Sequence, residues 1–304
     1  MATKTSLLGL TKPDYSDVQD VGVINGNMEI IDKEMGKRSR VYNLLDNSDF
    51  QNPVNQRGQS SYTAAGYTLD RWHQNNAGTV TQSDNGVTIT PTAPTSYFFR
   101  QFLSDETIAR ITGKTVTIAC CTSDGTVYSA TGTIPSEPGQ YQSLAKNIAT
   151  NWRMMFYRAE GGSCQIRFLP TTASAGQLGL KWAALYEGSY TTDTLPAYLQ
   201  KGYGVELAEC KRYDKQYSTI QLPLTVTTAA WAAAAIDYTD MRETPSVTYE
   251  LEGVYIGGTK YTSVKSITAR ALPASELVIN IGSSVAANQT GTIRFNSLAL
   301  SAGL

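Results

Sequence analysis

Short stretches of alternating polar and apolar residues, separated by turns, constrain the fold of this chain more than any other feature. They begin at Val41 and recur to the end of the sequence. In Lys114–Cys121, for example, Val116 and Ile118 share one face of a strand. Turn signals such as Asp124-Gly125 separate neighbouring stretches. Many short strands at this spacing predict antiparallel two-sheet sandwiches, of which the jelly roll is one form.

The expected strands fall into two groups. In the middle of the chain they are Val80–Thr81, Gly86–Thr90, Lys114–Cys121, Thr126–Thr133, Asn151–Arg158, Cys164–Leu169 and Leu178–Tyr186. Near the C-terminal end they are Ser218–Val226, Ala229–Asp237, Ser246–Tyr255, Ser263–Leu272, Glu276–Ile281 and Thr290–Ser301. A short helix is expected at Ser104–Ile111. A second helix is expected near Gly204–Tyr217, where Leu207, Cys210, Tyr213 and Tyr217 can share one face.

The N-terminal 40 residues follow a different period. Residues 1–13 read as an extended arm, and a helix is expected to begin near Asp14, with Asp14 or Ser16 as its cap and Asp17 in its first turn. Its apolar residues follow the a/d spacing of a coiled-coil seam. They are Val21, Ile24, Met28, Ile31 and Met35.

A single helix this short, with Gly26 inside it, is marginal in water, so the pattern predicts self-association. Isoleucine at d, with valine or methionine at a, favours three strands. The alternative is one amphipathic helix packed against its own domain.

Composition excludes several classes of partner. Charged residues make up 17% of the chain and the formal net charge is -1, which predicts binding neither to nucleic acid nor to an anionic membrane surface. No apolar run is long enough for a membrane span, and the N-terminus lacks the apolar core of a signal peptide. We therefore expect no membrane insertion and no signal-directed export.

Metal and cofactor chemistry is not expected either. Cys120 and Cys121 are adjacent, and neighbours on a strand point to opposite faces, so they are poorly placed to pair with each other. Cys164 and Cys210 stand alone, and His73 is the single histidine. We interpret all four cysteines as free, buried thiols and predict no metal site and no cofactor.

One segment resembles a known protein family. Asn43-Leu44-Leu45, Asn55-Gln56-Arg57-Gly58, Tyr67-Thr68 and Asp70-Arg71-Trp72 resemble the opening of a β-sandwich module found in tail-fibre and receptor-binding proteins of tailed phages. We interpret Trp72 as a core anchor of this module, with Asp70 and Arg71 forming a local ion pair or a hydrogen bond to a turn. Trp182 is interpreted as a second core anchor.

Two further patterns resemble the same family and occur in the expected order. Leu10-Thr11-Lys12-Pro13, Ile24-Asn25-Gly26-Asn27 and Ile31-Asp32 are similar to the N-terminal segment that joins such trimers to the virion, although Met28 stands where an aromatic residue is common. Residues 182–198 are similar to the closing strand and exit of the module, and 204–213 to the helix before a tip domain.

The expected architecture is therefore mainly β: a short trimeric coiled-coil helix, then two jelly-roll-like β-sandwich domains joined by a short helix. The boundaries are 1–40 for the arm and attachment helix, 41–203 for the carbohydrate-binding-like sandwich, 204–217 for the connecting helix, and 218–304 for the C-terminal tip. The tip carries no family pattern beyond its position.

A glycan site needs an aromatic platform with polar side chains beside it, and binding residues usually collect on loops. The expected tip offers two such groups. The candidates are Trp231, Asp237, Tyr238, Asp240, Arg242, Tyr255, Lys260 and Tyr261.

No catalytic residue is predicted. Glu250 and Glu252 are two apart in an expected strand, and Asp237, Asp240 and Glu243 cluster in a turn, so either set could supply paired carboxylates. Both are more simply interpreted as solvated strand faces or loop caps. No solenoid repeat indicates the long groove of a glycan depolymerase.

These observations favour a homotrimeric, non-enzymatic virion protein, assembled in the host cytoplasm, that attaches a tailed phage or phage-tail-like particle to bacterial surface polysaccharide. The arm would bind a tail or baseplate protein. Two alternatives stay open: a baseplate or collar protein that binds only other virion proteins, and a glycan depolymerase.

Overall fold

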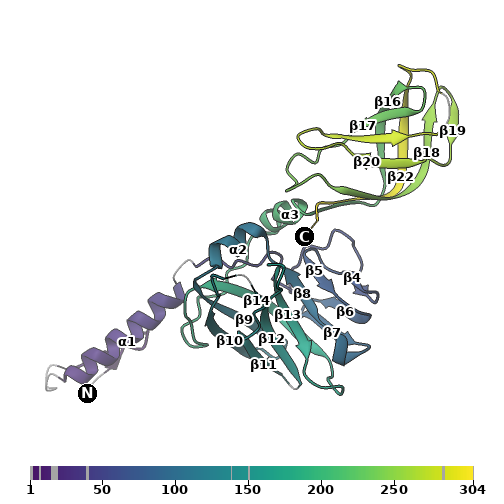
Figure 1. The fold of residues 1–304 in the computed structure, drawn as a ribbon. Coiled ribbons are helices and arrows are strands. Elements are labelled where there is room, and N and C mark those ends of the chain that lie inside the picture. Colours follow the sequence, from purple (N-terminus) through teal and green to yellow (C-terminus); the bar gives the residue numbers. More distant parts are fainter. Residues whose placement is uncertain are drawn as a thin grey trace. The chain divides into compact units, whose positions relative to one another are not determined.

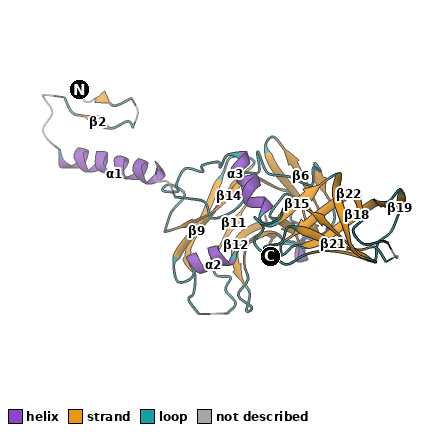
Figure 2. Cartoon of the chain, turned by 90° about the horizontal axis from the view of Figure 1, so that it is seen from above, coloured by secondary structure: helices purple, strands orange, loops and turns teal. Residues whose placement is uncertain are grey.

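The computed structural model describes residues 3–6, 8–14, 20–38, 41–137, 139–149, 151–282 and 285–303, and their fold is mainly antiparallel β (Figure 1). Strands dominate the chain, with short helices between them (Figure 2). The chain divides into two compact units. Unit 1 comprises Met1–Gln51, Thr63–Ala65 and Gln74–Gln200, and unit 2 comprises Asn52–Tyr62, Gly66–His73 and Lys201–Leu304.

The last segment of unit 2 starts at Lys201, close to the boundary expected at residue 203. Most of the stretch from Asn52 to His73, which the sequence places in the first sandwich, belongs to unit 2. It contains the short strands β3 (Ser61–Tyr62), β4 (Gly66–Tyr67) and the start of β5 (Trp72–Gln74). Trp72 is fully buried, as a core anchor must be.

The N-terminal arm of unit 1 is a hairpin rather than an extended segment. Strand β1 (Thr3–Lys4) pairs with β2 (Thr11–Lys12). The Asn27 side chain then holds the arm to helix α1 (Val21–Arg38), because its amide accepts a hydrogen bond from Thr11 N at 2.8 Å and donates one to Thr11 O at 2.9 Å. The described helix begins at Val21, with Asp20 accepting from Gly22 N at 2.8 Å, and not near Asp14. The alternative cap Ser16 and the first-turn residue Asp17 lie outside the described residues.

The rest of unit 1 forms two antiparallel sheets, as the sandwich prediction requires. The first has the order β10-β9-β14-β7-β6. Its strands are β6 (Gly78–Ser83), β7 (Gly86–Pro91), β9 (Thr115–Thr122), β10 (Val127–Thr133) and β14 (Leu178–Glu187). The second includes the order β11-β12-β13-β8. Its strands are β8 (Phe99–Phe102), β11 (Ala145–Ile148), β12 (Trp152–Arg158) and β13 (Cys164–Pro170).

Buried side chains from both sheets form the core of unit 1. Ile118 from β9, Phe156 from β12 and Phe168 from β13 are all fully buried. Helix α2 (Asp105–Ile111) lies where the sequence predicts a helix, and Ser104 caps it by accepting a hydrogen bond from Thr107 N at 3.1 Å. A single 3-10 turn, η1 (Pro94–Ser96), precedes β8.

The C-terminal segment of unit 2 opens with helix α3 (Tyr203–Lys211), which is shorter than expected. Residues Asp214–Tyr217, expected to be helical, form strand β15, because they pair with Leu298–Ser301 at the end of the last strand. The remaining strands are β16 (Ile220–Thr228), β17 (Trp231–Ala235), β18 (Ser246–Ile256), β19 (Thr259–Tyr261), β20 (Ser266–Ala269), β21 (Glu276–Asn280) and β22 (Thr290–Ser301).

The sequence predicts two facing sheets in the C-terminal region, whereas these strands join in one sheet of order β19-β18-β22-β16-β17-β21-β20. The sheet curls so that β20 contacts β18, giving a half-barrel around one apolar core. Its proximal end is defined here by the Asp214–Ser301 pair, and its distal end by the Ile256–Gly291 pair. No helix in the described parts of the chain is long and apolar enough to cross a membrane.

Candidate functional site

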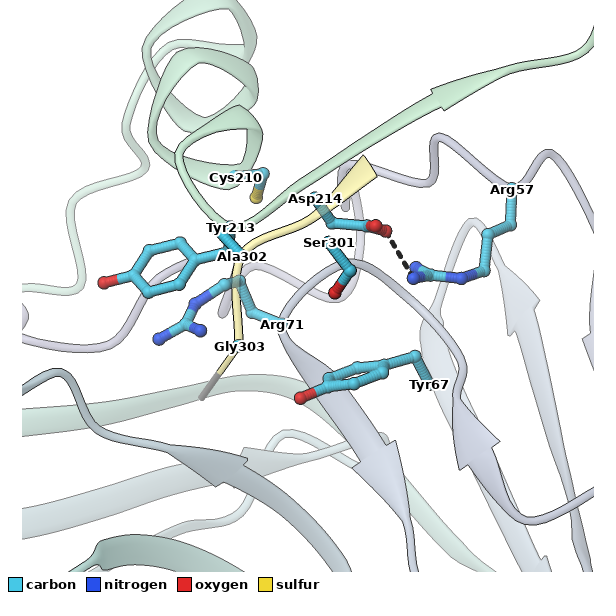
Figure 3. A pocket seen from close by; sticks show the side chains of 9 residues that line it. All are labelled: Arg57, Tyr67, Arg71, Cys210, Tyr213, Asp214, Ser301, Ala302 and Gly303. Atoms are coloured by element: carbon cyan, nitrogen blue, oxygen red, sulfur yellow. Dashed lines mark hydrogen bonds and ion pairs between the residues drawn. The ribbon is translucent and has the colours of Figure 1, made fainter. Parts of the chain in front are cut away.

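A cavity of about 120 Å³, here called the Arg57 pocket, lies at the proximal end of unit 2 (Figure 3). It is assembled from stretches that are far apart in the sequence: the loop around Arg57, strand β4, the turn before β5, the α3–β15 junction and the C-terminal end of β22. Its lining residues are Arg57, Tyr67, Arg71, Cys210, Tyr213, Asp214 and Ser301–Gly303.

Local backbone geometry directs the arginines of the pocket. Asn55 organises the loop that carries Arg57, since its side chain donates to Gln59 O at 2.8 Å and accepts from Gly58 N at 3.2 Å. Arg71 has a φ of 70°, a left-handed conformation that is uncommon for a residue with a side chain. Such backbone strain persists where the surrounding structure requires it.

Arg57 is the centre of a buried ionic network. Its guanidinium forms an ion pair with Asp214 and lies 3.7 Å from an oxygen of Asp70. Gln56 completes the network: its backbone N donates to Asp70 at 2.7 Å, and its side chain donates to Asp70 at 3.0 Å and to Asp214 O at 2.8 Å. Asp70 therefore makes one of the two contacts expected of it, a hydrogen bond to a turn, because it accepts from the backbone N of Gln56 in the Gln56-Arg57 turn.

Burial governs the ionisation of both carboxyl groups. It raises the pKa of Asp70 above its ordinary value, against the opposing effects of the Gln56 hydrogen bonds and the Arg57 charge. Burial likewise raises the pKa of Asp214, and the charge of Arg57 opposes this shift most strongly. Taking two carboxylates out of water is costly, and one arginine between them compensates only part of that cost.

The second arginine, Arg71, contacts an aromatic ring. Its guanidinium lies 3.5 Å from the ring centroid of Tyr213, and that of Arg242 lies 5.4 Å from the same ring. A cationic group over a tyrosine face is attracted by the ring quadrupole. Arg242, one of the glycan candidates, is thus held near the Arg57 pocket and away from Trp231.

The pocket combines guanidinium groups, phenol rings and one lining carboxylate, Asp214. Such a set can hold a small polar group, but the cavity is smaller than the roughly 300–1,000 Å³ clefts that hold larger ligands. Asp214 is already engaged by Arg57 and by Gln216, which donates at 2.9 Å and 3.0 Å. The described residues hold no cluster of histidine, cysteine, aspartate and glutamate that could bind a metal ion.

The structure separates the glycan candidates into two groups at opposite ends of the unit 2 sheet. Asp237, Tyr238, Asp240 and Arg242 follow β17 at the proximal end, whereas Trp231, at the start of β17, lies at the distal end with Tyr255, Lys260 and Tyr261. The sequence treats Trp231 and the Asp237 group as neighbours, but the length of β17 separates them.

Three residues of the proximal group have structural contacts. Tyr238 is fully buried, and its hydroxyl contacts Arg270 O at 2.7 Å and Glu276 O at 2.8 Å, so it is no surface platform. Asp240 pairs with the buried Lys215. Asp237 accepts hydrogen bonds from Thr239, and these lower its pKa. The prediction that Tyr238 binds glycan is therefore wrong, because its side chain is part of the core.

In the distal group Trp231 and Lys260 are exposed, whereas Tyr255 and Tyr261 are half-buried. Trp231 is 40% exposed and pairs across the sheet with Asn280. A polar hollow of about 460 Å³ lies at the same end, lined by Lys260–Lys265, Ile281 and Gly282. Lys260 and Tyr255 both contact Glu252, at 3.3 Å and 2.5 Å, so one carboxylate fixes two of the candidates.

The carboxylate pair Glu250 and Glu252 does not share a regular strand face. Irregularities in the β18–β22 register fall on both sides of Leu251. The hydrogen bond from Tyr255 lowers the pKa of Glu252, which is the opposite of the raised pKa that a general acid needs.

Trp182 in unit 1 and the cysteines of both units fit a structural role. Trp182 is half-buried and stacks on Tyr198 at 4.8 Å between ring centroids. The cysteines Cys120, Cys121, Cys164 and Cys210 are free and buried, as predicted.

The α1 stripe is largely exposed. Val21, Ile24, Met28 and Met35 expose 67%, 54%, 62% and 68% of their surface, while Ile31 is half-buried.

No protein-family model, curated protein or solved structure matches this chain. Its function is therefore inferred from the residues and their geometry.

Sequence reasoning missed the Arg57 pocket because its parts come from three distant segments. Residues 55–58, 70–72 and 204–213 are all recognised as patterns, but nothing in the chain indicates that they meet. A usable signal did exist for Tyr238. In the run Trp231–Tyr238, Tyr238 has the same parity as Ala232, Ala234 and Ile236, which predicts an inward position.

Proposed function

We propose that this chain is a homotrimeric tail-fibre or receptor-binding protein of a tailed phage or a phage-tail-like particle. In this proposal the N-terminal arm and α1 attach the trimer to a tail or baseplate protein. Unit 1 serves as the shoulder, and the distal end of unit 2 contacts polysaccharide on the bacterial surface.

The exposed apolar stripe on α1 carries the proposal. Its members recur at gaps of 3, 4, 3 and 4, the a/d spacing of a coiled-coil seam. Four of the five are more than half exposed in the single chain. Each large apolar side chain left in water forgoes about 1.5–3 kcal/mol of burial free energy, so a matching stripe on identical subunits is the economical partner.

The arm contacts α1 beside the stripe and leaves most of it open. Asn27, which binds Thr11 through two hydrogen bonds, follows Ile24 by three positions and precedes Ile31 by four. The arm therefore borders the stripe and leaves Ile24 and Met28 accessible. A parallel bundle would then place the arm hairpins beside its seam, where a virion protein could reach them.

The distal end of unit 2 supports a glycan as receptor. Trp231 supplies an exposed aromatic surface, and the polar hollow at the same end includes Lys260, Tyr261 and Lys265. Aromatic faces beside polar donors are the usual means of holding sugar rings. Three copies in one trimer would strengthen weak single-site binding through avidity.

Mass in solution tests the trimer. Sedimentation equilibrium of the full chain is expected to give three times the 33.0 kDa of one chain. Ile24→Asp should convert the trimer to monomers, whereas Asn25→Asp, which places the same charge on an exposed neighbouring position, should leave it intact. A monomeric wild-type chain at micromolar concentration would overturn the proposal.

Binding to host envelope polysaccharide tests the receptor assignment. Trp231→Ala is expected to weaken binding of the trimer to immobilised polysaccharide, and Tyr203→Ala, which removes another exposed aromatic residue from α3, should not. A trimer that binds virion proteins but no bacterial polysaccharide would favour the baseplate or collar alternative. Shortened polysaccharide products after incubation would favour the depolymerase.

A further inference from the structure

The outer face of the second sheet of unit 1 carries two arginines on neighbouring strands. Arg100 on β8 and Arg167 on β13 are register partners, so their side chains leave the sheet at the same level and on the same side (strands in Figure 1). Their neighbours Phe99 and Phe168 are fully buried, which places the arginines on the side away from the core.

Aromatic rings flank both guanidinium groups. Arg167 lies 3.5 Å from the ring centroid of Tyr157 and 4.4 Å from that of Phe98. Arg100 lies 4.9 Å from Phe98 and 4.4 Å from Phe102. These five residues are called the Arg–aromatic ladder below.

The ladder holds positive charge in an unfavourable place. Like charges directly opposite each other on paired strands repel. Burial lowers the pKa of Arg167, and the nearby charge of Arg100 lowers it further. Within the described residues no carboxylate forms an ion pair with Arg167; its neutral partner Gln165 accepts from Arg167 at 2.8 Å and from Arg100 at 3.3 Å.

Packing alone does not require this arrangement. Threonine or valine at both positions would cover the same sheet face and suit a strand without the charge repulsion. The aromatic rings orient the guanidinium groups and offset part of the cost. An anionic group beside Arg167 would offset more of the cost of burying its charge, because a guanidinium fork matches a carboxylate or a phosphate in geometry and charge.

We propose that the Arg–aromatic ladder binds an anionic saccharide, with Arg100 and Arg167 holding its carboxylate or phosphate group and the edges of Phe98 and Tyr157 contacting the sugar ring. This adds a second glycan-binding surface, on unit 1, to the one proposed at the distal end of unit 2. It extends the proposed function in its choice of ligand, but it requires neither the trimer nor the distal site.

Calorimetric titration of the full chain tests the ladder. The probes are oligogalacturonate, which carries carboxylates, a glycerol-phosphate oligomer, which carries phosphates, and a neutral malto-oligosaccharide of equal length. We expect binding to one or both anionic probes, weakened by added salt, and none to the neutral probe. The preferred anionic probe identifies the charged group.

Variants separate the ladder from general attraction to positive charge. Arg167→Gln is expected to weaken binding about tenfold or more, as the loss of a charge-assisted hydrogen bond implies. Lys146→Gln removes one charge from β11. Lys146 pairs with the core residue Met154, so it lies on the other side of the sheet from the ladder, and its loss should have little effect on binding. Arg167→Lys keeps the charge but loses the planar fork, and it should bind more weakly than wild type.

Three results would overturn the proposal: no binding of either anionic probe, equal losses in Arg167→Gln and Lys146→Gln, or wild-type affinity in Arg167→Gln. A melting curve of each variant distinguishes a loss of binding from misfolding. Because Arg167→Gln removes a half-buried charge, it should not lower the melting temperature. A monomeric chain that still binds oligogalacturonate through Arg167 would refute the trimer while supporting the ladder. A trimer that does not bind oligogalacturonate would support the trimer and refute the ladder.

Discussion

Arg57 and Asp214 are 157 positions apart in the chain, yet their side chains form an ion pair inside unit 2. Asp70, buried beside them, accepts hydrogen bonds from Gln56 and lies 3.7 Å from the Arg57 guanidinium. An arginine placed between two buried carboxylates stabilises a fold mainly because its removal would leave those charges uncompensated.

Replacing Arg57 should therefore destabilise unit 2. We expect Arg57→Gln to lower the free energy of unfolding by about 3 kcal/mol, near the lower end of the range for breaking a buried ion pair. The control is Arg110→Gln, which breaks the exposed pair with Glu187 and should change stability little. Urea unfolding measures the change in free energy of unfolding in each variant. Equal changes would show that the Arg57 ion pairs stabilise the protein no more than an exposed pair does.

The raised pKa of Asp214 predicts a particular pH dependence. Its folded-state pKa lies above the ordinary value of 3.8, so protonation favours the folded state. The difference in free energy of unfolding between wild type and Asp214→Asn should therefore favour wild type most below pH 3.8. This advantage should decline as the pH rises through the raised pKa of Asp214.

Asp124 provides a control of opposite sign. Hydrogen bonds from Thr122 and Thr126 lower its pKa, so its contribution should be present above pH 3.8 and decline as the pH falls through the lowered pKa. Urea unfolding of wild type, Asp214→Asn and Asp124→Asn across this range compares the slopes. Slopes of the same sign would contradict the burial argument for Asp214.

At the scale of elements, local period predicts most strands. Lys114–Cys121 corresponds to β9 (Thr115–Thr122), and Gly86–Thr90 corresponds to β7 (Gly86–Pro91). In β7 the buried Val87 and Ile89 alternate with half-buried Thr88 and Thr90, whereas β9 is buried on both faces after Thr115. A turn with asparagine precedes β7, and one with glycine follows β9. Ser104 likewise marks the start of α2, because its hydroxyl supplies the cap.

Elements defined by distant partners were not predictable in the same way. Asp214–Tyr217 has apolar spacing compatible with a helix, but it forms a strand because Leu298–Ser301 offers backbone partners. The Asn52–His73 stretch has strand-like residues, but its contacts include the distant residues Asp214 and Tyr213. Periodicity reports which face of an element is apolar, and it carries no information about which element will cover that face.

The arm and α1 offer a prediction at the same scale. Asn27→Ala removes both hydrogen bonds to Thr11, so amide exchange in the β1–β2 hairpin should become about tenfold faster or more, given about 0.5–1.5 kcal/mol for each bond. Asn25→Ala alters an exposed neighbouring position and serves as the control. Exchange measured by mass spectrometry that is the same in both variants would show that Asn27 does not hold the arm.

At the scale of the whole molecule, the proposed function rests on repetition of identical chains. Neither the exposed Trp231 nor the Arg–aromatic ladder forms a deep enclosed cleft, so binding by one chain is expected to be weak. Linked sites on one particle raise the apparent affinity by about 10²–10⁴ without any new contact. Attachment strength would then be set by α1, far along the sequence from the residues that touch the sugar.

Ile24→Asp tests this separation of roles. On a surface densely coated with polysaccharide, the variant should bind about 10²–10⁴-fold more weakly than wild type, because each monomer engages singly. For a soluble short oligosaccharide, which occupies one site at a time, the two proteins should have equal affinity. Asn25→Asp should match wild type in both measurements. If Ile24→Asp binds the dense surface as tightly as wild type, multivalency does not determine attachment. If Ile24→Asp also fails to bind the soluble oligosaccharide that wild type binds, α1 contributes to the sugar site itself.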